Sequence, residues 1–170
     1  MRRFPLPAAI VAVVLAVPFV ANATSSVKVG ALPATVTLPA GWTATGATST
    51  ARFNATGPNG GRLAVTTGGS FPSGLPFSLF VSTETTAARN AYRAEDPHAS
   101  VSSKKVKLPP GDAVQITTVV HHGGVTSAID LFSLLHNGVT YHFTFFTNGP
   151  SLGSSAGSFA SIAKSIHFTK

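Results

Sequence analysis

The sequence predicts an α+β domain, built on a mostly antiparallel sheet with helices on both faces. Three strands, expected over 113–121, 125–135 and 139–147, are joined by Gly123-Gly124 and Asn137-Gly138, which are strong hairpin signals. The middle strand carries apolar residues at both odd and even positions, so both of its faces are expected to be covered. Apolar residues at three- and four-residue spacing predict two helices, over 78–94 and about 152–164, one for each face.

Shorter elements complete this expectation. Ser78 is expected to cap the first helix, and Asp96-Pro97 to end it. A glycine- and proline-rich loop over 68–76 precedes that helix, and a final short strand is expected to return to the sheet. The additional strands are expected over residues 36–42, 50–55, 62–67, 100–108 and 165–168.

The chain divides into a predicted signal peptide over 1–23, an N-terminal lead over 24–35 and a single domain over 36–170. The first segment combines a basic start, an apolar run over 8–20 and the small-residue pattern Ala21-Asn22-Ala23, with cleavage expected after Ala23. That run is shorter than the roughly 20 residues that span a bilayer, so no retained transmembrane helix is expected. The predicted location is therefore secreted, or extracytoplasmic.

Composition limits the classes of function. Of 170 residues, 44% are hydrophobic and 10% charged, which is enough apolar material for a folded core. Cysteine is absent, which excludes disulfides and a lipid-anchored cysteine after the signal peptide. The formal net charge is +7 at pH 7, but the export signal argues against a nucleic-acid partner.

The basic residues gather in one place only, at Lys104, Lys105 and Lys107. Two interpretations are open. The lysines could contact an anionic surface such as a wall polymer or lipid. They could equally protect an exposed edge strand against aggregation, which is the commoner use of lysine in such a strand.

The segment GSSAG, residues 153–157, fits the G-x-S-x-G pattern of the α/β-hydrolase nucleophile. In that fold an acid and then a histidine follow the serine along the chain. After Ser155 the sequence offers His167 but no Asp or Glu, and the serines here are expected to cap the second helix instead. A serine hydrolase using Ser155 is a remote alternative, and no catalytic residue is predicted.

The six histidines predict no metal site. The two hairpins place His122 and His136 at opposite ends of the middle strand, roughly 36 Å apart at about 3.3 Å per residue. The same register places His142 opposite Ser133, so no three-ligand zinc set can form in these strands. No cofactor is predicted.

Asp130 lies in the middle of a strand, in SAIDLFSLL, where burial of a charged carboxylate is costly. It is expected to point to an exposed strip or to be held by hydrogen bonds from neighbouring Thr or His. A structural role is favoured over a functional one.

Three segments carry a family resemblance: VTLPAGW over 36–42, GVTYHFTF over 138–145 and FASIAKSIHF over 159–168. With the helix around Phe80, they resemble the opening strand, the G-x-x-Y-x-x-x-F strand and the F-x-x-I-x-x-S-F-x-F ending of the PsbP-like superfamily. The resemblance runs from about Val36 to Phe168. These motifs are mostly core residues, so they bear on fold more than on function.

The resemblance implies a non-enzymatic protein that binds other proteins or helps to assemble complexes. The superfamily includes a photosystem II subunit and Ran-binding proteins, but no residue here matches their partner contacts. The leading hypothesis is a secreted binding or adaptor domain at the cell envelope, with an unidentified partner. The alternative is a small-molecule or anionic-polymer binding protein that uses a cleft between the hairpin strands and a helix, with the three lysines nearby.

Overall fold

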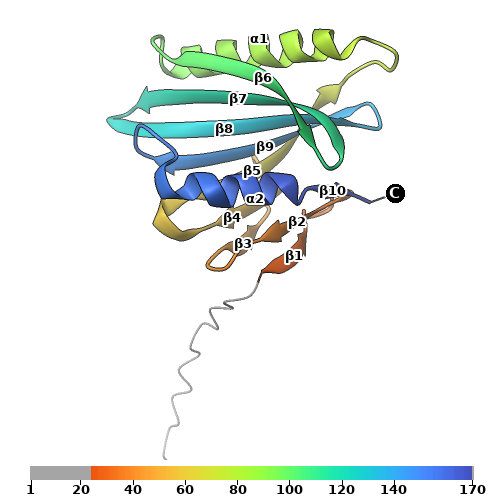
Figure 1. The fold of residues 1–170 in the computed structure, drawn as a ribbon. Coiled ribbons are helices and arrows are strands. Elements are labelled where there is room, and N and C mark those ends of the chain that lie inside the picture. Colours follow the sequence, from red (N-terminus) through yellow and green to blue (C-terminus); the bar gives the residue numbers. More distant parts are fainter. Residues whose placement is uncertain (1–23, 170) are drawn as a thin grey trace, which may run out of the picture.

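The computed structural model describes residues 24–169, and the predicted signal peptide over 1–23 lies outside them. Two α-helices, α1 (Phe77–Glu95) and α2 (Ala156–Lys164), accompany two sheets (Figure 1). Short 3-10 turns, η1 (Pro58–Gly60) and η2 (Gly153–Ser155), precede β5 and α2. The strands are β1 (Ser25–Lys28), β2 (Ala34–Leu38), β3 (Thr43–Gly46), β4 (Phe53–Thr56), β5 (Arg62–Ser70), β6 (Ser100–Leu108), β7 (Gly111–His122), β8 (Val125–His136), β9 (Val139–Asn148) and β10 (His167–Phe168).

The larger sheet has seven strands in the order β3-β4-β5-β9-β8-β7-β6, and every pairing in it is antiparallel. The two predicted tight turns join its central strands. Gly123 and Gly124 have φ of 57° and 77°, and Asn137 and Gly138 have φ of 49° and 74°. Two successive positive φ values match the right-handed strand twist, which is why these dipeptides form hairpins. The α+β class and the mostly antiparallel sheet are confirmed.

The alternation of side chains separates two cores. Val114, Ile116 and Leu131 point to the face on which Phe80 and Ala88 of α1 pack. Phe143 and Phe145 point to the opposite face, where Phe159 of α2 lies 4.9 Å from the Phe145 ring. That second face is also covered by β2, whose Ala34, Val36 and Leu38 belong to the same core.

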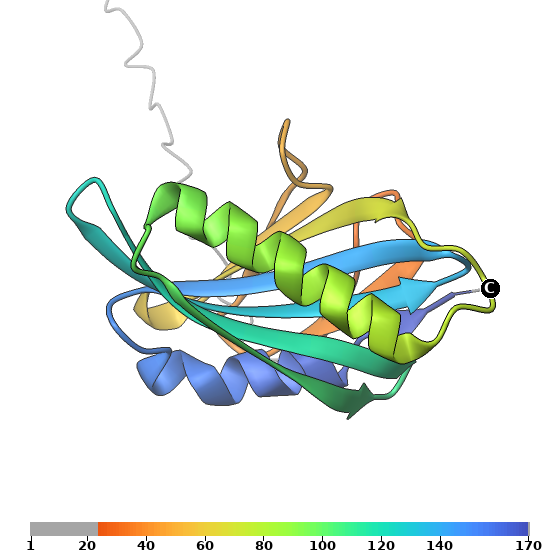
Figure 2. The same ribbon diagram turned by 90° about the horizontal axis from the view of Figure 1, so that it is seen from above.

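Helix α1 packs on β6 and β7. In the view from the α1 side, β5 lies to one side of the helix and is not covered by it (Figure 2). The expected cap at Ser78 is wrong. The helix is preceded by Pro76, whose φ of −60° and ψ of 140° direct the chain into the first turn without a side-chain hydrogen bond. The predicted end of the helix before Pro97 is confirmed, and Asp96 is its C-cap residue. No helix among residues 24–169 is long and apolar enough to cross a membrane.

The final strand does not return to the main sheet, contrary to expectation. β10 pairs with β2 in a three-stranded sheet of order β1-β2-β10, and β1 arises from the polar lead where no strand was expected. The chain is directed there by Ser165, whose Oγ accepts a 2.7 Å hydrogen bond from the Thr37 backbone N–H. Ser155 makes no capping hydrogen bond at the start of α2, so that expectation is also wrong.

Gly57 lies against the indole of Trp42, the only tryptophan. A Cβ at residue 57 would overlap the ring, so Gly57→Ala is expected to lower the free energy of unfolding by about 1–3 kcal/mol. Urea unfolding followed by circular dichroism measures the loss, and the emission of Trp42 should change with it. The control is Gly69→Ala, where an added Cβ meets no atom within 4 Å. Equal effects of the two substitutions would contradict the overlap.

Candidate binding groove beside helix α1

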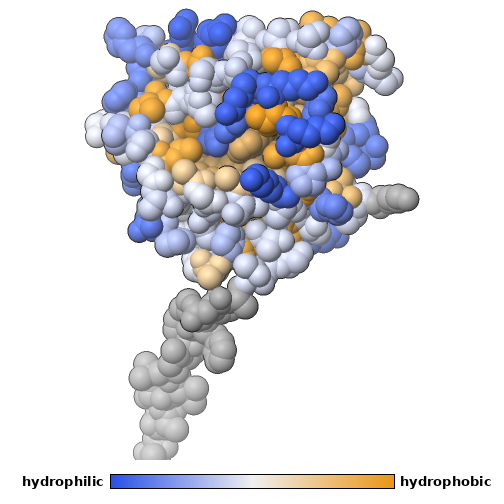
Figure 3. All heavy atoms as spheres, in the orientation of Figure 1, coloured by the Kyte–Doolittle hydropathy of each residue, from blue (hydrophilic) through white to orange (hydrophobic). Residues whose placement is uncertain are grey.

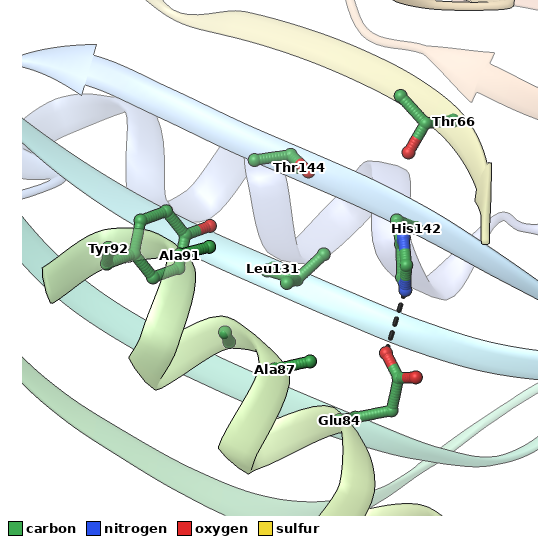
Figure 4. Close-up of a pocket in the computed structure, with 9 residues that line it drawn as sticks. Thr66, Glu84, Ala87, Ala91, Tyr92, Leu131, His142 and Thr144 are labelled. Carbon is green, nitrogen blue, oxygen red and sulfur yellow. Dashed lines mark hydrogen bonds and ion pairs between the residues drawn. The ribbon is translucent and has the colours of Figure 1, made fainter. Parts of the chain in front are cut away.

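A groove of about 270 Å³ lies between α1 and the strands β5, β8 and β9, and we call it the α1 groove (Figure 4). The helix contributes one wall and the sheet the other. Its floor and helix wall are apolar, and its polar groups come from both sides. The lining residues are Thr66, Glu84, Ala87, Ala88, Ala91, Tyr92, Leu131, His142 and Thr144.

Glu84 enters this interface because of its position on the helix. It is four residues from Phe80 and four from Ala88, and both are buried against the sheet. Residues four apart lie on the same side of a helix, so Glu84 must also face the sheet. Its side chain is only 13% exposed.

His142 meets Glu84 from the sheet. In the ladder it pairs with Ser133 on one side and Thr66 on the other, and its side chain points to the α1 face. Its Nε2 lies 2.7 Å from Oε2 of Glu84, and the side chain is 26% exposed. Figure 4 shows this pair closing one end of the α1 groove, with Tyr92 at the other end.

The electrostatics keep Glu84 charged. Burial alone would raise the pKa of Glu84, but the hydrogen bond and charge of His142 outweigh it and lower the pKa below 4.5. Burial, with a smaller effect of Glu95, raises the pKa of Tyr92 to about 12, so its phenol remains a neutral donor. The groove thus has an ionised acceptor at one end and a hydroxyl at the other.

Several polar groups at this site have no partner within the described part of the chain. Ser133 is completely buried, and its Oγ has no hydrogen-bond partner there. The hydroxyls of Thr66, Thr144 and Tyr92 line the groove, and no side-chain hydrogen bond within residues 24–169 engages them. The hydroxyls of Thr66, Thr144 and Tyr92 are available to a bound molecule, whereas the buried hydroxyl of Ser133 is not.

The three lysines do not share one face. Lys104 lies opposite Gln115 in the β6/β7 ladder, on the face away from α1, whereas Lys105 and Lys107 point to the α1 side. Nζ of Lys105 lies 2.8 Å, and that of Lys107 3.3 Å, from the Asp112 carboxylate. Figure 3 shows hydrophilic residues gathered over β6 and β7. Two of the three ammonium groups are therefore already paired at this edge of the sheet.

Ser155 and His167 are not brought together. Ser155 is buried at the start of α2, and His167 lies beyond the end of that helix. The nine-residue helix between them is about 13 Å long. A 3-10 turn, rather than a strand, leads into Ser155, so the local geometry of the hydrolase motif is not formed.

The predicted register of the histidines is confirmed. His122 pairs with Val125 at one end of β8, His136 pairs with Val139 at the other, and His142 lies opposite Ser133. In the described region no three His, Asp or Glu side chains gather closely enough to hold a metal ion.

Asp130 is buried on the face away from α1, and it is held by hydrogen bonds as expected, although the donor is neither Thr nor His. Nε2 of Gln115 donates to both carboxylate oxygens, at 2.9 and 3.0 Å. Burial raises the pKa of Asp130, against smaller lowering effects of Gln115 and Lys104. The contact indicates a structural role.

Asp96 joins the end of α1 to β7. It accepts hydrogen bonds from the backbone N–H groups of His98 and His121 at 2.9 Å, and its Oδ2 lies 3.0 Å from Nδ1 of His121. The backbone and ring of His121, and then the backbone of His98, lower the pKa of Asp96 to about 2. The charged form is therefore favoured in the folded protein.

Because the folded pKa of Asp96 lies below 3.8, its stabilising effect is present above about pH 4 and is lost as the pH falls towards 2. We expect Asp96→Asn to be less stable at neutral pH and to lose less stability over that acid range. Urea midpoints across the range measure both effects, with the exposed Glu95→Gln as the control. Parallel pH profiles for wild type and Asp96→Asn would contradict the assignment.

The Glu84–His142 pair was not predicted from the sequence. In the sequence Glu84 interrupts the apolar stripe of the first helix. Because Glu84 lies on the stripe that faces the sheet, its carboxylate requires a polar partner there, and this was the available signal.

Comparison with solved structures identifies the fold. The solution structure of cyanobacterial PsbP (CyanoP) from Synechocystis sp. PCC 6803 is similar with a TM-score of 0.64, over 86% of this chain and 93% of that one. The chain has a PsbP-like fold. The sequence identity is 10%, so the likeness shows the fold alone.

A second solved structure is less similar. A crystal structure from Bacteroides thetaiotaomicron VPI-5482 has a TM-score of 0.50 and 14% identity, and covers 81% of this chain but 46% of its own. No protein-family model and no curated protein sequence matches the chain. The resemblance noted from VTLPAGW and the later motifs is thus confirmed at the level of a PsbP-like fold.

Proposed function

We propose that this chain is a secreted, non-enzymatic binding or adaptor domain of the cell envelope, and that the α1 groove is its binding site. In this proposal the PsbP-like domain is an α/β/α sandwich in which α1 forms one wall of the site. The ligand is held by the hydroxyls that line the groove and make no side-chain hydrogen bond within the described residues.

The observation that carries the proposal is the position of the Glu84–His142 pair in the wall of an open groove. Moving charged groups out of water costs free energy that a pair often does not recover, and apolar residues of similar volume are frequently more stable. A sequence that departs from its apolar pattern at one place commonly does so for function. The unpartnered Ser133 beside the pair is a second such departure.

One feature favours binding over a chemical step. The serine beside the Glu84–His142 pair, Ser133, has 0% exposure, so a substrate has no access to its hydroxyl. A groove that positions a ligand without attacking it is consistent with this burial.

Export is supported by the basic, apolar and small-residue order of the first 23 residues, and free secretion by the absence of cysteine. The test is N-terminal sequencing of the protein recovered from the medium of an expressing bacterium. We expect the sequence to begin at Thr24. Recovery only from cells, with residues 1–23 retained, would overturn secretion.

Binding in the groove is tested by capture of envelope extract on the purified protein, with bound proteins, lipids and metabolites identified by mass spectrometry. Ala91 is an exposed α1 residue of the groove wall, so Ala91→Trp should block the site. Ala94→Trp is the matched control, since Ala94 is exposed on the same helix but does not line the groove.

We expect the captured material to be lost with Ala91→Trp and retained with Ala94→Trp, both variants keeping the wild-type circular dichroism spectrum. Equal capture by the two variants, or no captured material at all, would overturn the proposed site.

A further inference from the structure

Resting on the proposed function, we infer that the ligand of the α1 groove is a neutral saccharide, bound in an extended form that continues past Thr66 into a neighbouring hollow. The inference comes from the hydrogen-bonding groups that face the groove, from its apolar surfaces and from its balance of charge.

The hydrogen-bonding groups match sugar hydroxyls. Thr66, Thr144 and Tyr92 present hydroxyls that both donate and accept, as sugar hydroxyls do. Oε2 of Glu84 makes the contact with His142, so Oε1 is the carboxylate oxygen that His142 does not engage. A ligand with many hydroxyls can satisfy all of these groups at once, which an apolar ligand cannot.

The apolar surfaces match the C–H faces of sugar rings. Leu131 forms the floor, and Ala87, Ala88 and Ala91 form the helix wall. Alanine side chains leave room for a ring to approach the helix, and the Tyr92 ring closes the end of the groove. Apolar walls with a few placed polar groups are the usual composition of small-molecule sites.

Within the α1 groove itself, the charge balance argues against a polyanion. The lining of the α1 groove contains one carboxylate and one imidazole, with neither Lys nor Arg. Since the carboxylate of Glu84 is ionised at neutral pH, it would repel a phosphate or uronate group placed beside it. A neutral ligand avoids that repulsion.

An extended ligand is indicated by a second hollow of about 200 Å³ that shares Thr66 with the first. Its other lining residues are again mostly hydroxyl-bearing: Thr48, Ser49, Thr50, Ala51, Arg52 and Thr67. Thr66 therefore lines both hollows. A chain of sugar units can occupy both, whereas a monosaccharide fills one.

The test is an NMR titration of the purified protein with cellohexaose, maltohexaose and chitohexaose as neutral probes. Polygalacturonate serves as the polyanion, and fully deacetylated chitohexaose as the amine. We expect at least one neutral probe to shift the His142 ring and the methyl signals of Thr66 and Thr144, with neither charged probe binding more tightly.

Thr66→Val and Thr144→Val each remove one hydroxyl at nearly constant volume, and each should weaken the binding of that probe roughly three- to tenfold. Thr56→Val, at an exposed β4 position outside both hollows, should leave the affinity unchanged.

Three results would overturn the saccharide inference. They are that no neutral probe binds, that a charged probe binds more tightly than the neutral ones, or that the affinity is unchanged by Thr66→Val and Thr144→Val. The proposed function is overturned by a different result, namely equal capture of envelope material by Ala91→Trp and Ala94→Trp. If no saccharide binds but capture still depends on the groove, the site is retained and only the class of ligand changes.

Discussion

Phe159→Ala is expected to lower the free energy of unfolding by about 3–5 kcal/mol, the largest effect of any change described for this protein. Phe159 is 1% exposed and joins three parts of the core. Its ring lies 4.9 Å from that of Phe145 in the main sheet and 5.8 Å from that of Trp42, while α2 also packs on β2. Truncation leaves a cavity at the point where helix and sheets meet.

The measurement is urea unfolding followed by circular dichroism, because Trp42 fluorescence would itself change when its neighbour is removed. Phe146→Ala is the matched control. Phe146 is partly exposed on the α1 side of β9, where it lies under the Arg62 guanidinium, so its loss should be much smaller. Similar losses for the two phenylalanines would contradict the account of the core.

Glu84→Ala is expected to lower the free energy of unfolding by about 2 kcal/mol at neutral pH, because it leaves His142 beside the helix without its partner. The value is below the 3–5 kcal/mol typical of fully buried pairs, since both side chains keep some exposure. Glu95→Ala, at the exposed end of the same helix, should change the free energy by no more than about 0.5 kcal/mol.

The difference in stability between wild type and Glu84→Ala should decrease as the pH falls. The pKa of Glu84 is lowered in the folded protein, so its contribution is present above about pH 4.5 and is lost as the pH falls through the folded value. Wild type and Glu84→Ala should therefore converge in acid. A difference that is constant with pH would show that the lost helix packing, and not the charge, is responsible.

Local signals accounted for most of the main sheet. The dipeptides Gly123-Gly124 and Asn137-Gly138 fix their turns through their own backbone preferences, and the register of β7, β8 and β9 follows from those turns. The β6 strand, over 100–108, was predicted with the observed bounds for the same reason, since alternation and a Pro-Pro-Gly turn are local features.

The small sheet depends on contacts between distant parts of the chain. β1 is a polar segment without recognisable alternation, and β10, although a strand was expected over 165–168, has two residues that do not indicate their partner strand. Their strand character comes from β2, which offers an edge to each, and from the contact of Ser165 with Thr37, 128 residues away. Tertiary context of this kind is not visible in a short window of sequence.

The candidate site was missed for a similar reason. Glu84 and His142 are separated by 58 residues and lie on a helix and a strand that meet only after folding. The strand register correctly placed His142 opposite Ser133, but it gave no information on which helix residue would lie above it. The lysines, in contrast, were conspicuous in the sequence, yet strand alternation placed Lys104 on the opposite face from the other two.

The central claim is that the polar pair is present for binding rather than for stability, and the double variant Glu84→Leu/His142→Leu tests it most directly. Leucines at both positions remove the charges together and fill the interface with apolar side chains. We predict that the double variant is at least as stable as wild type in urea and captures none of the groove-dependent envelope material. A double variant that is as unstable as Glu84→Ala and captures that material undiminished would contradict the claim.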